Sequence, residues 1–210
     1  DVFAVQEEVT QAIVRTIAPQ IETAERLRAV RRHPANLSAY EIAVRAWAKA
    51  CEAHIKNDHA LPEAAIGEAK GALAIDARST LALNALADGQ SQHVNLGTAA
   101  DQETARQEGM AAASRAIEAD RSDCTGYGLK GRLLVLASNP DRIDEALANA
   151  RQGHALDSHH MLSLAGLAFI ETLAGNPEYA IEHLQQALRI SPRDPGQHLQ
   201  RGRQLHSDLR

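Results

Sequence analysis

Apolar residues recur every three or four positions between Met161 and Pro192, in the stretch MLSLAGLAFIETLAGNPEYAIEHLQQALRISP. This spacing predicts a first helix, and Gly175-Asn176-Pro177 predicts a turn after it. A second stripe of apolar residues follows the turn, and polar residues fill the positions between its members: Ala180, Ile181, Leu184, Ala187 and Leu188. Pro192 predicts the end of this second helix, because its ring clashes with the preceding turn. The stretch is therefore predicted to form a helical hairpin.

The preceding stretch, Tyr127 to Ser158, repeats this pattern. Ala146 and Gly153 lie 34 residues before Ala180 and Ala187, and an Asn-Pro pair again separates two helical segments. A helix-turn-helix unit of 34 residues resembles the tetratricopeptide (TPR) repeat, in which each hairpin covers the apolar face of its neighbour. The resemblance predicts an all-α fold of the TPR-like α–α superhelix type, a right-handed solenoid of helical hairpins.

We expect three regions along the chain: an N-terminal linker or packing helix over 1–35, kinked near Pro19; an array of about four repeats over 36–192; and a C-terminal capping helix over 193–210. The repeats are predicted at 36–79, 80–121, 125–158 and 159–192. The second repeat is longer than the usual 34 residues. Ala72 and Ala116, the corresponding alanines of the first and second repeats, are 44 residues apart, and the extra residues fall at 93–100. This insertion is either a contact for a partner or tolerated variation of a surface loop.

Helix boundaries follow from local signals. Asn36 or Ser38 is expected to cap a helix that reaches about Lys56, and Trp47 within it is expected to wedge between helices. The next helix begins near Pro62 and has a buried stripe that ends at Ile75. In the second repeat, we expect the first helix to reach about Asn95 and to stop at Gly97, and Thr98 to cap the next helix together with Asp101.

Composition and charge exclude several functional classes. Only 3% of the residues are aromatic, so the core must consist mainly of Ala, Leu, Ile and Val, and the net charge of −5 argues against binding to nucleic acid. The arginines between Arg26 and Arg32 are interpreted as a solvated helix end. No apolar run reaches the roughly 18 residues that span a bilayer. Cys51 and Cys124 have no CxxC partner, which favours reduced thiols and a cytoplasmic location.

The first 50 residues carry a second resemblance. The run DVFAVQEEVTQAIVRTIAPQIETAE, followed by NLSAYEIAVRAWA, is similar to the linker and first TPR helix of bacterial class III adenylate and guanylate cyclases with C-terminal TPR arrays. Similar segments follow the winged-helix domain of some bacterial transcriptional regulators. The chain begins without Met and inside a helical pattern, which indicates a fragment of a longer protein. No strand is present to carry the paired metal-binding aspartates of a cyclase, so we expect this fragment not to be an enzyme.

Other catalytic or cofactor-binding patterns are absent from the sequence. The histidines do not show the i, i+4 pair with a carboxylate that a catalytic zinc site needs, and His154, His159 and His160 are interpreted as solvated or capping residues. Gly126 and Gly128 belong to a helical spacing and not to a phosphate loop. We therefore predict no catalytic residues, no metal and no cofactor.

A TPR groove binds its partner through positions 2, 5, 9 and 12 of each first helix. In this chain the candidate groove residues are Asn84, Asp88, Ser91, Val135, Ser138, Leu162, Ala165, Phe169 and Thr172. Families that bind a C-terminal carboxylate place Lys, Asn and Arg at such positions, and only Asn84 matches here, with Arg132 at a neighbouring position. The groove is thus predicted to be lined by small and apolar residues and to suit a helical segment of another protein or a second copy of the chain.

The first functional hypothesis is a non-catalytic interaction module of a bacterial signalling protein, a fragment of an adenylate or guanylate cyclase. The alternative within the same architecture is the sensor or oligomerisation half of a TPR-containing transcriptional regulator. An independent helical ligand-binding protein or enzyme is a third hypothesis.

Overall fold

The computed structural model describes residues 37–56, 58–136 and 140–190, and every regular element in these ranges is a helix. The chain divides into two units, Asp1–Leu37 and Ser38–Arg210, and the described residues belong to the second apart from Leu37. Several predicted features lie outside the described residues: the helix kinked near Pro19, the cap at Asn36, the candidate groove residue Ser138, the stop at Pro192 and the capping helix over 193–210.

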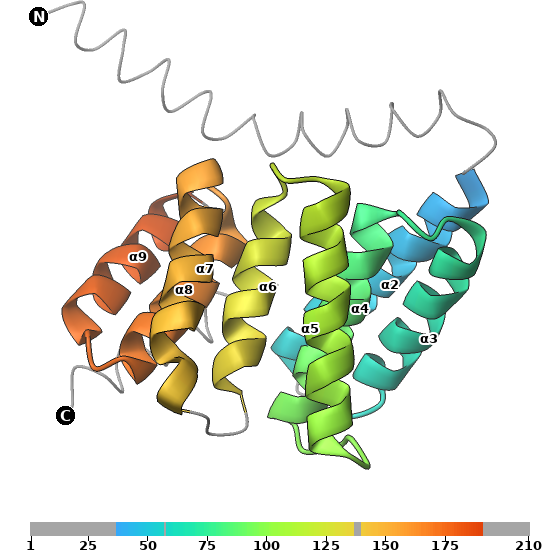
Figure 1. The fold of residues 1–210 in the computed structure, drawn as a ribbon, viewed down its shortest axis with the longest axis horizontal. Coiled ribbons are helices and arrows are strands. Elements are labelled where there is room, and N and C mark those ends of the chain that lie inside the picture. Colours follow the sequence, from blue (N-terminus) through green and yellow to red (C-terminus); the bar gives the residue numbers. More distant parts are fainter. Residues whose placement is uncertain (1–36, 57, 137–139, 191–210) are drawn as a thin grey trace, which may run out of the picture. The chain divides into compact units, whose positions relative to one another are not determined.

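Consecutive α-helices of the described ranges pair as hairpins (Figure 1). The first hairpin consists of α2 (Leu37–Lys56) and α3 (Leu61–Ile75), and the second of α4 (Thr80–Asn95) and α5 (Gln102–Ala119). In the third, the 3₁₀ helix η2 (Pro140–Arg142) lies between α6 (Cys124–Val135) and α7 (Ile143–Leu156). The fourth consists of α8 (Met161–Leu173) and α9 (Pro177–Ile190).

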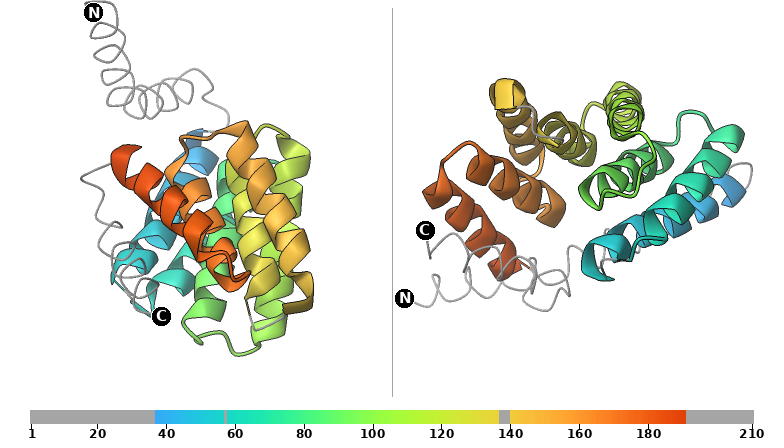
Figure 2. Two further views of the ribbon diagram at one scale, coloured as in Figure 1. Left: turned by 90° about the vertical axis from the view of Figure 1, so that its left-hand side faces the viewer. Right: turned by 90° about the horizontal axis from the view of Figure 1, so that it is seen from below.

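Neighbouring hairpins share their interfaces and lie side by side (Figure 2). Helix α4 packs against α3 as well as against its own partner α5, and α6 packs against α4, α5, α7 and α8. Ala46 of α2 belongs to the same buried cluster as Ala69 of α3 and Ala85 of α4. The fold is therefore the predicted all-α solenoid of helical hairpins.

Small side chains fill much of the core. Ala65, Ala69 and Ala72 of α3 are fully buried, and so are many alanines of the other helices. Trp47 is partly buried and packs against the largest of the core clusters, as predicted. Ile75 differs from its prediction, because its side chain is 50% exposed. Ile75 is the last residue of α3.

Glycine brings two helices of the third hairpin into direct backbone contact. A Cβ atom at Gly131 of α6 would lie 2.8 Å from the carbonyl oxygen of Ala146, and one at Gly153 of α7 would lie 2.8 Å from that of Cys124. Real Cβ atoms do not approach so closely, so both positions require glycine for this packing.

The turns that lead from one hairpin to the next share a single design. Asp76, Asp120 and Asp157 each follow the second helix of a hairpin and donate their N–H to the carbonyl four residues earlier. The Oδ1 atom of each aspartate accepts the N–H two residues later, from Arg78, Ser122 and His159 at 2.9–3.0 Å. This side-chain turn explains why an aspartate follows three of the second helices.

Positive φ angles mark the turns within two hairpins. Gly97 has a φ of 67° after α4 and Gly175 has a φ of 79° after α8, conformations that suit glycine at the end of a helix. The predicted cap of the next helix is corrected: Asp101 alone caps α5, because its Oδ1 accepts the N–H groups of Glu103 and Thr104. The Thr98 hydroxyl instead donates to the His93 carbonyl. Ser38 lies inside α2 and is not its cap.

Candidate functional site

A buried carboxylate lies where α2, α4 and α6 meet. The Asp88 side chain on α4 is 0% exposed. Its Oδ1 accepts a hydrogen bond from Nη2 of Arg132 on α6 and lies 3.1 Å from Nε2 of His54 on α2. Three helices from three hairpins are thus joined at one oxygen atom.

Arg132 extends this cluster along α4. Its Nε donates to the Ser91 hydroxyl at 2.8 Å, and its Nη1 lies 3.2 Å from Nε2 of His54. Nε2 of Gln92 lies 2.8 Å from the other ring nitrogen of His54. We refer to these five residues as the Asp88 network: His54, Asp88, Ser91, Gln92 and Arg132.

The charges of Asp88 and Arg132 balance each other. Burial by itself raises the pKa of Asp88, but the charges and hydrogen bonds of His54 and Arg132 lower it by more, so the pKa lies well below its ordinary value. Asp88 is therefore ionised at neutral pH and compensates the guanidinium of Arg132, which is always charged. The second carboxylate oxygen of Asp88 is buried and accepts no hydrogen bond from the described residues.

A second polar contact ties α4 to the beginning of α6. Nδ2 of Asn84 donates to Oδ2 of Asp123. Asp123 also caps α6, because its carboxylate accepts the N–H groups of Thr125 and Gly126. The side chains of Asn84 and Arg132, which a carboxylate-binding groove would use, are thus both bonded within the chain.

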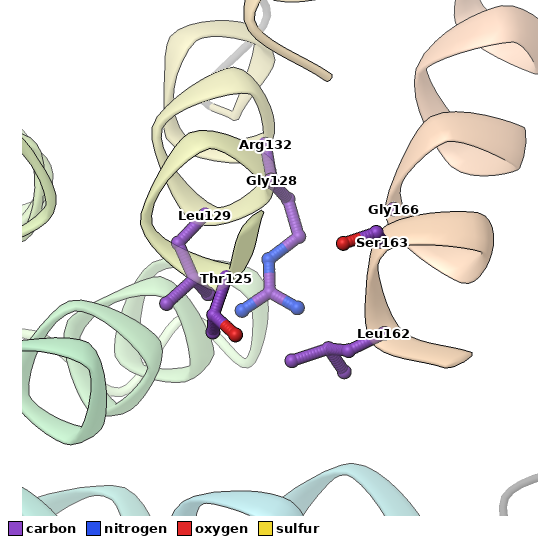
Figure 3. Close-up of a pocket in the computed structure, with 7 residues that line it drawn as sticks. All are labelled: Thr125, Gly128, Leu129, Arg132, Leu162, Ser163 and Gly166. Carbon is purple, nitrogen blue, oxygen red and sulfur yellow. The ribbon is translucent and has the colours of Figure 1, made fainter. Parts of the chain in front are cut away.

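A small pocket opens between α6 and α8 (Figure 3). Arg132 extends from α6 toward Leu162 of α8, and Thr125 lies beside the guanidinium. The complete lining consists of Thr125, Gly128, Leu129, Arg132, Leu162, Ser163 and Gly166.

Two glycines keep the space between the pocket's helices open. A Cβ atom at Gly128 would have Ser163 Cα at 3.9 Å as its nearest neighbour, and one at Gly166 would have the Gly128 carbonyl oxygen at 4.0 Å. These are ordinary contacts, so helix packing does not require glycine at either position. The missing side chains expose backbone to the space between α6 and α8.

The structure places the predicted groove residues in different environments. Asn84, Asp88 and Ser91 are buried and bonded within the chain, and Val135 is buried in the core between α6, α7 and α8. Leu162 lines the pocket and Ala165 is partly buried nearby on the same helix. Phe169 packs against two core clusters, and the exposed Thr172 donates its hydroxyl to the Ala168 carbonyl. That these residues contact a partner stays a prediction.

Several site residues were not predicted from the sequence. Thr125, Leu129 and Gly166 line the pocket but lie outside the repeat positions that predict a groove, and Arg132 lies next to one of those positions. His54 had one signal that could have found it, because it lies 34 residues, one repeat length, before Asp88.

Histidines form one further cluster, on the fourth hairpin and the helix before it. The rings of His154 and His183 meet edge to face with centroids 5.3 Å apart, and burial lowers the pKa of both. His160 caps α8 by accepting the N–H of Ser163, in keeping with its predicted capping role. Within the described residues, no three side chains of the metal-binding types are placed to hold an ion, and no helix is long and apolar enough to cross a membrane.

Comparison with solved structures identifies the fold. A thermophilic TPR protein of Thermus thermophilus superposes with a TM-score of 0.58 and 18% identity, over 72% of this chain and 75% of that one. MamA matches with a TM-score of 0.42 and 15% identity, over 76% of this chain and 88% of that one. YrrB, a TPR protein with an unusual peptide-binding site, matches with a TM-score of 0.38 and 18% identity, over 67% and 84%. No protein-family model and no curated protein sequence matches the chain. The first likeness shows that the solenoid is TPR-like, as predicted.

Proposed function

We propose that the hairpins over 37–190 form a protein-interaction module that binds a peptide segment of a partner on the surface shared by α6 and α8. The observation that carries this proposal is the pocket between these two first helices, in which the Arg132 guanidinium and the Leu162 side chain face the same space. A guanidinium next to an aliphatic side chain suits a peptide, which presents carbonyl groups and apolar side chains together.

The architecture supports the same proposal. Stacked hairpins present the same face of each first helix in succession, so a solenoid offers an extended surface rather than one deep cavity. Here α4 contacts α6 and α6 contacts α8, which makes that surface continuous across three hairpins. The polar side chains of α4 are bonded to α2 and α6, so they hold this surface rigid.

Selection from a peptide library tests the module function directly. The complete 210-residue chain is immobilised and panned against a phage-displayed library of random 16-residue peptides, and enriched peptides are measured by fluorescence anisotropy. We expect a family of peptides with micromolar Kd that the Leu162→Ala variant binds more weakly. Recovery of no saturable binder, or of binders indifferent to every residue of the α6–α8 surface, would contradict the proposal.

The larger protein is a separate proposal, which rests on the sequence. We propose that the module belongs to a bacterial signalling protein, in the first place an adenylate or guanylate cyclase, because residues 1–25 and 36–48 resemble the segments that join such enzymes to TPR arrays. Reading the gene upstream of the codon for Asp1 tests this. A cyclase homology domain is the expected result, and a winged-helix domain would assign the module to a transcriptional regulator instead.

A further inference from the structure

The pocket between α6 and α8 contains one charged side chain, and that charge is already compensated. Of the seven lining residues, only Arg132 carries a charge, and none is acidic. Arg132 is paired with the buried carboxylate of Asp88, which stays ionised because its pKa is lowered. The pocket therefore offers hydrogen-bond donors without a net positive charge.

Arg132 retains donors for a ligand. A guanidinium has five N–H groups. The contacts to Ser91 and Asp88 engage Nε and Nη2 once each, and Nη1 lies 3.2 Å from Nε2 of His54, so each terminal nitrogen keeps at least one N–H for a further acceptor. An uncharged carbonyl oxygen matches these donors, whereas a carboxylate would have to approach Asp88 without a surplus positive charge to attract it.

The short distance between α6 and α8 limits the size of the group that enters the pocket. Gly128 and Gly166 expose backbone at positions where a Cβ atom would find ordinary contacts only, so the space is open but narrow. Leu129 and Leu162 close its sides. A residue with at most a methyl or hydroxymethyl side chain fits such a site, and a longer side chain would meet these walls.

We propose that this pocket is a specificity subsite that takes a small, uncharged residue, Gly, Ala or Ser, of the bound peptide segment, and that Arg132 donates to a backbone carbonyl of that segment. The inference rests on the proposed module function and deepens it, because it predicts which residue the partner presents. It also predicts that Asp88 acts as a positioning residue that suppresses binding of acidic peptides.

A pair of matched glycine variants tests the size limit. Gly166→Val adds a side chain to the pocket, and Gly67→Val makes the same change in α3 at a position where a Cβ atom meets nothing within 4 Å. With a peptide enriched in the library selection, we expect Gly166→Val to lower affinity at least about tenfold, as for an excess methyl group in a fitted site, and Gly67→Val to leave it unchanged. Circular dichroism and thermal unfolding establish that both variants fold.

A double-mutant cycle identifies the peptide residue that occupies the subsite. Each position of the peptide is changed in turn to Ala and Val, and each change is measured against the wild-type chain and Gly166→Ala. One position should show coupling, and the wild-type chain should prefer Gly, Ala or Ser there over Asp, Glu and Leu.

A variant of Asp88 tests the effect of charge on the peptide preference. Asp88→Asn removes the compensating charge from Arg132 while keeping a side chain of the same shape, so we expect it to shift the preference at the coupled position toward Asp and Glu. If this variant does not fold, the residue type that the wild-type chain prefers at the coupled peptide position decides whether the pocket disfavours acidic residues. A wild-type preference for Asp or Glu overturns the charge argument.

The outcomes separate the two proposals. If no peptide binds, the module function fails. If peptides bind but Gly166→Val behaves like Gly67→Val, the subsite is overturned while the function stands. Sedimentation velocity tests whether a second copy of the chain occupies the pocket instead of a peptide. A wild-type dimer that dissociates in the Gly166→Val variant would show this and would overturn the peptide subsite.

Discussion

His54 and Asp88 are 34 residues apart in the sequence, and their side chains meet, with Nε2 of His54 3.1 Å from Oδ1 of Asp88. The separation equals the 34 residues of a TPR repeat, and it brings the last turn of α2 against the middle of α4. Stacking of the hairpins places a histidine of the first hairpin against an aspartate of the second. Arg132 adds the third hairpin to this contact.

Removal of the Arg132 guanidinium should destabilise the chain strongly. Arg132→Ala leaves Asp88 as a buried charge paired with His54 alone, and breaking a buried ion pair costs about 3–5 kcal/mol. Urea unfolding followed by circular dichroism measures the loss. Arg78→Ala, on an exposed residue between α3 and α4, is the control and should change the free energy of unfolding by less than about 0.5 kcal/mol. Equal stability of the two variants would show that the network contributes nothing to the fold.

Ala180→Arg should unfold the fourth hairpin. Ala180 is 2% exposed and packs with Ala168 and Leu184, so the new side chain forces a charge between α8 and α9. We expect a loss of more than about 2 kcal/mol, from overpacking and from burial of the charge. Gln185→Arg, on the exposed side of α9, is the matched control. Hydrogen exchange should show lost protection in α8 and α9 first, and an unchanged Tm would mean that the assigned register of α9 is wrong.

Leu162→Ala should weaken peptide binding without weakening the fold. Leu162 is partly buried and lines the pocket, and truncation of a residue in a binding site often costs more than about 1 kcal/mol, or about fivefold in Kd. Leu173→Ala removes the same atoms from a side chain on α8 that is 52% exposed and lies outside the pocket lining, and it should leave Kd unchanged. Anisotropy titrations with a library-selected peptide compare the two variants.

Phe169→Ala is expected to differ from Leu162→Ala. Both residues are candidate groove residues from the sequence, but Phe169 packs against the two largest core clusters. We expect its truncation to lower both peptide affinity and the free energy of unfolding, the latter by about 1–3 kcal/mol for a partly buried aromatic side chain. A variant with wild-type Tm would show that the ring is not part of the core.

Stability should fall as the pH drops below about 6.5, the ordinary pKa of histidine. The pKa values of His154 and His183 are lowered in the folded chain, chiefly by burial, so the unfolded chain binds protons more readily as the pH falls through that value. The loss continues until the lowered pKa values are reached. In the double variant His154→Gln/His183→Gln, the dependence of Tm on pH between 7 and 5 should flatten. The further loss below about pH 4 should persist, because it comes from Asp88, whose lowered pKa stabilises the folded chain only while its carboxylate is ionised.

Two glycine-to-alanine variants should have opposite effects. At Gly131 the added Cβ atom would lie 2.8 Å from the Ala146 carbonyl oxygen, so α6 and α7 must separate, at a cost of about 1–3 kcal/mol. At Gly71, in the exposed middle of α3, the Cβ atom meets nothing within 4 Å, and alanine should stabilise the helix by about 0.5–1 kcal/mol. Thermal unfolding of both variants measures the difference, and a stable Gly131→Ala would refute the close packing of α6 on α7.

The helices could be predicted from the sequence because their signals are local. The apolar period, the prolines at the helix starts and Gly97 and Gly175 at the helix ends each act within a few residues, and the predicted end of α4 at Asn95 is the observed one. The error at Thr98 arose because Thr98 and Asp101 are both good caps, and only the structure shows that α5 begins at Gln102.

The site was less predictable because its contacts join distant residues. Asp88 and Arg132 are 44 residues apart, across the long loop of the second hairpin, so the repeat period does not align them. The positions assigned to a groove from the repeat pattern included Asp88 and Ser91, which other side chains of this chain cover. Glycines at 128 and 166 also gave no signal, because the sequence does not distinguish a glycine that packing requires from one that leaves space.

The aspartate turns at 76, 120 and 157 determine how such a chain can change its length during evolution. Each turn closes through the same bond between its aspartate side chain and the N–H two residues later, so a gene duplication or deletion that begins and ends at these codons would rejoin equivalent turns. The buried ion pair of Asp88 and Arg132 joins the second and third hairpins, so loss of either one would leave a charge without its partner. A hairpin inserted after Asp157 would separate Arg151 of α7 from the buried Glu171 of α8, whereas loss of the fourth hairpin would leave behind only the exposed Arg151, so the chain is most easily shortened at that end.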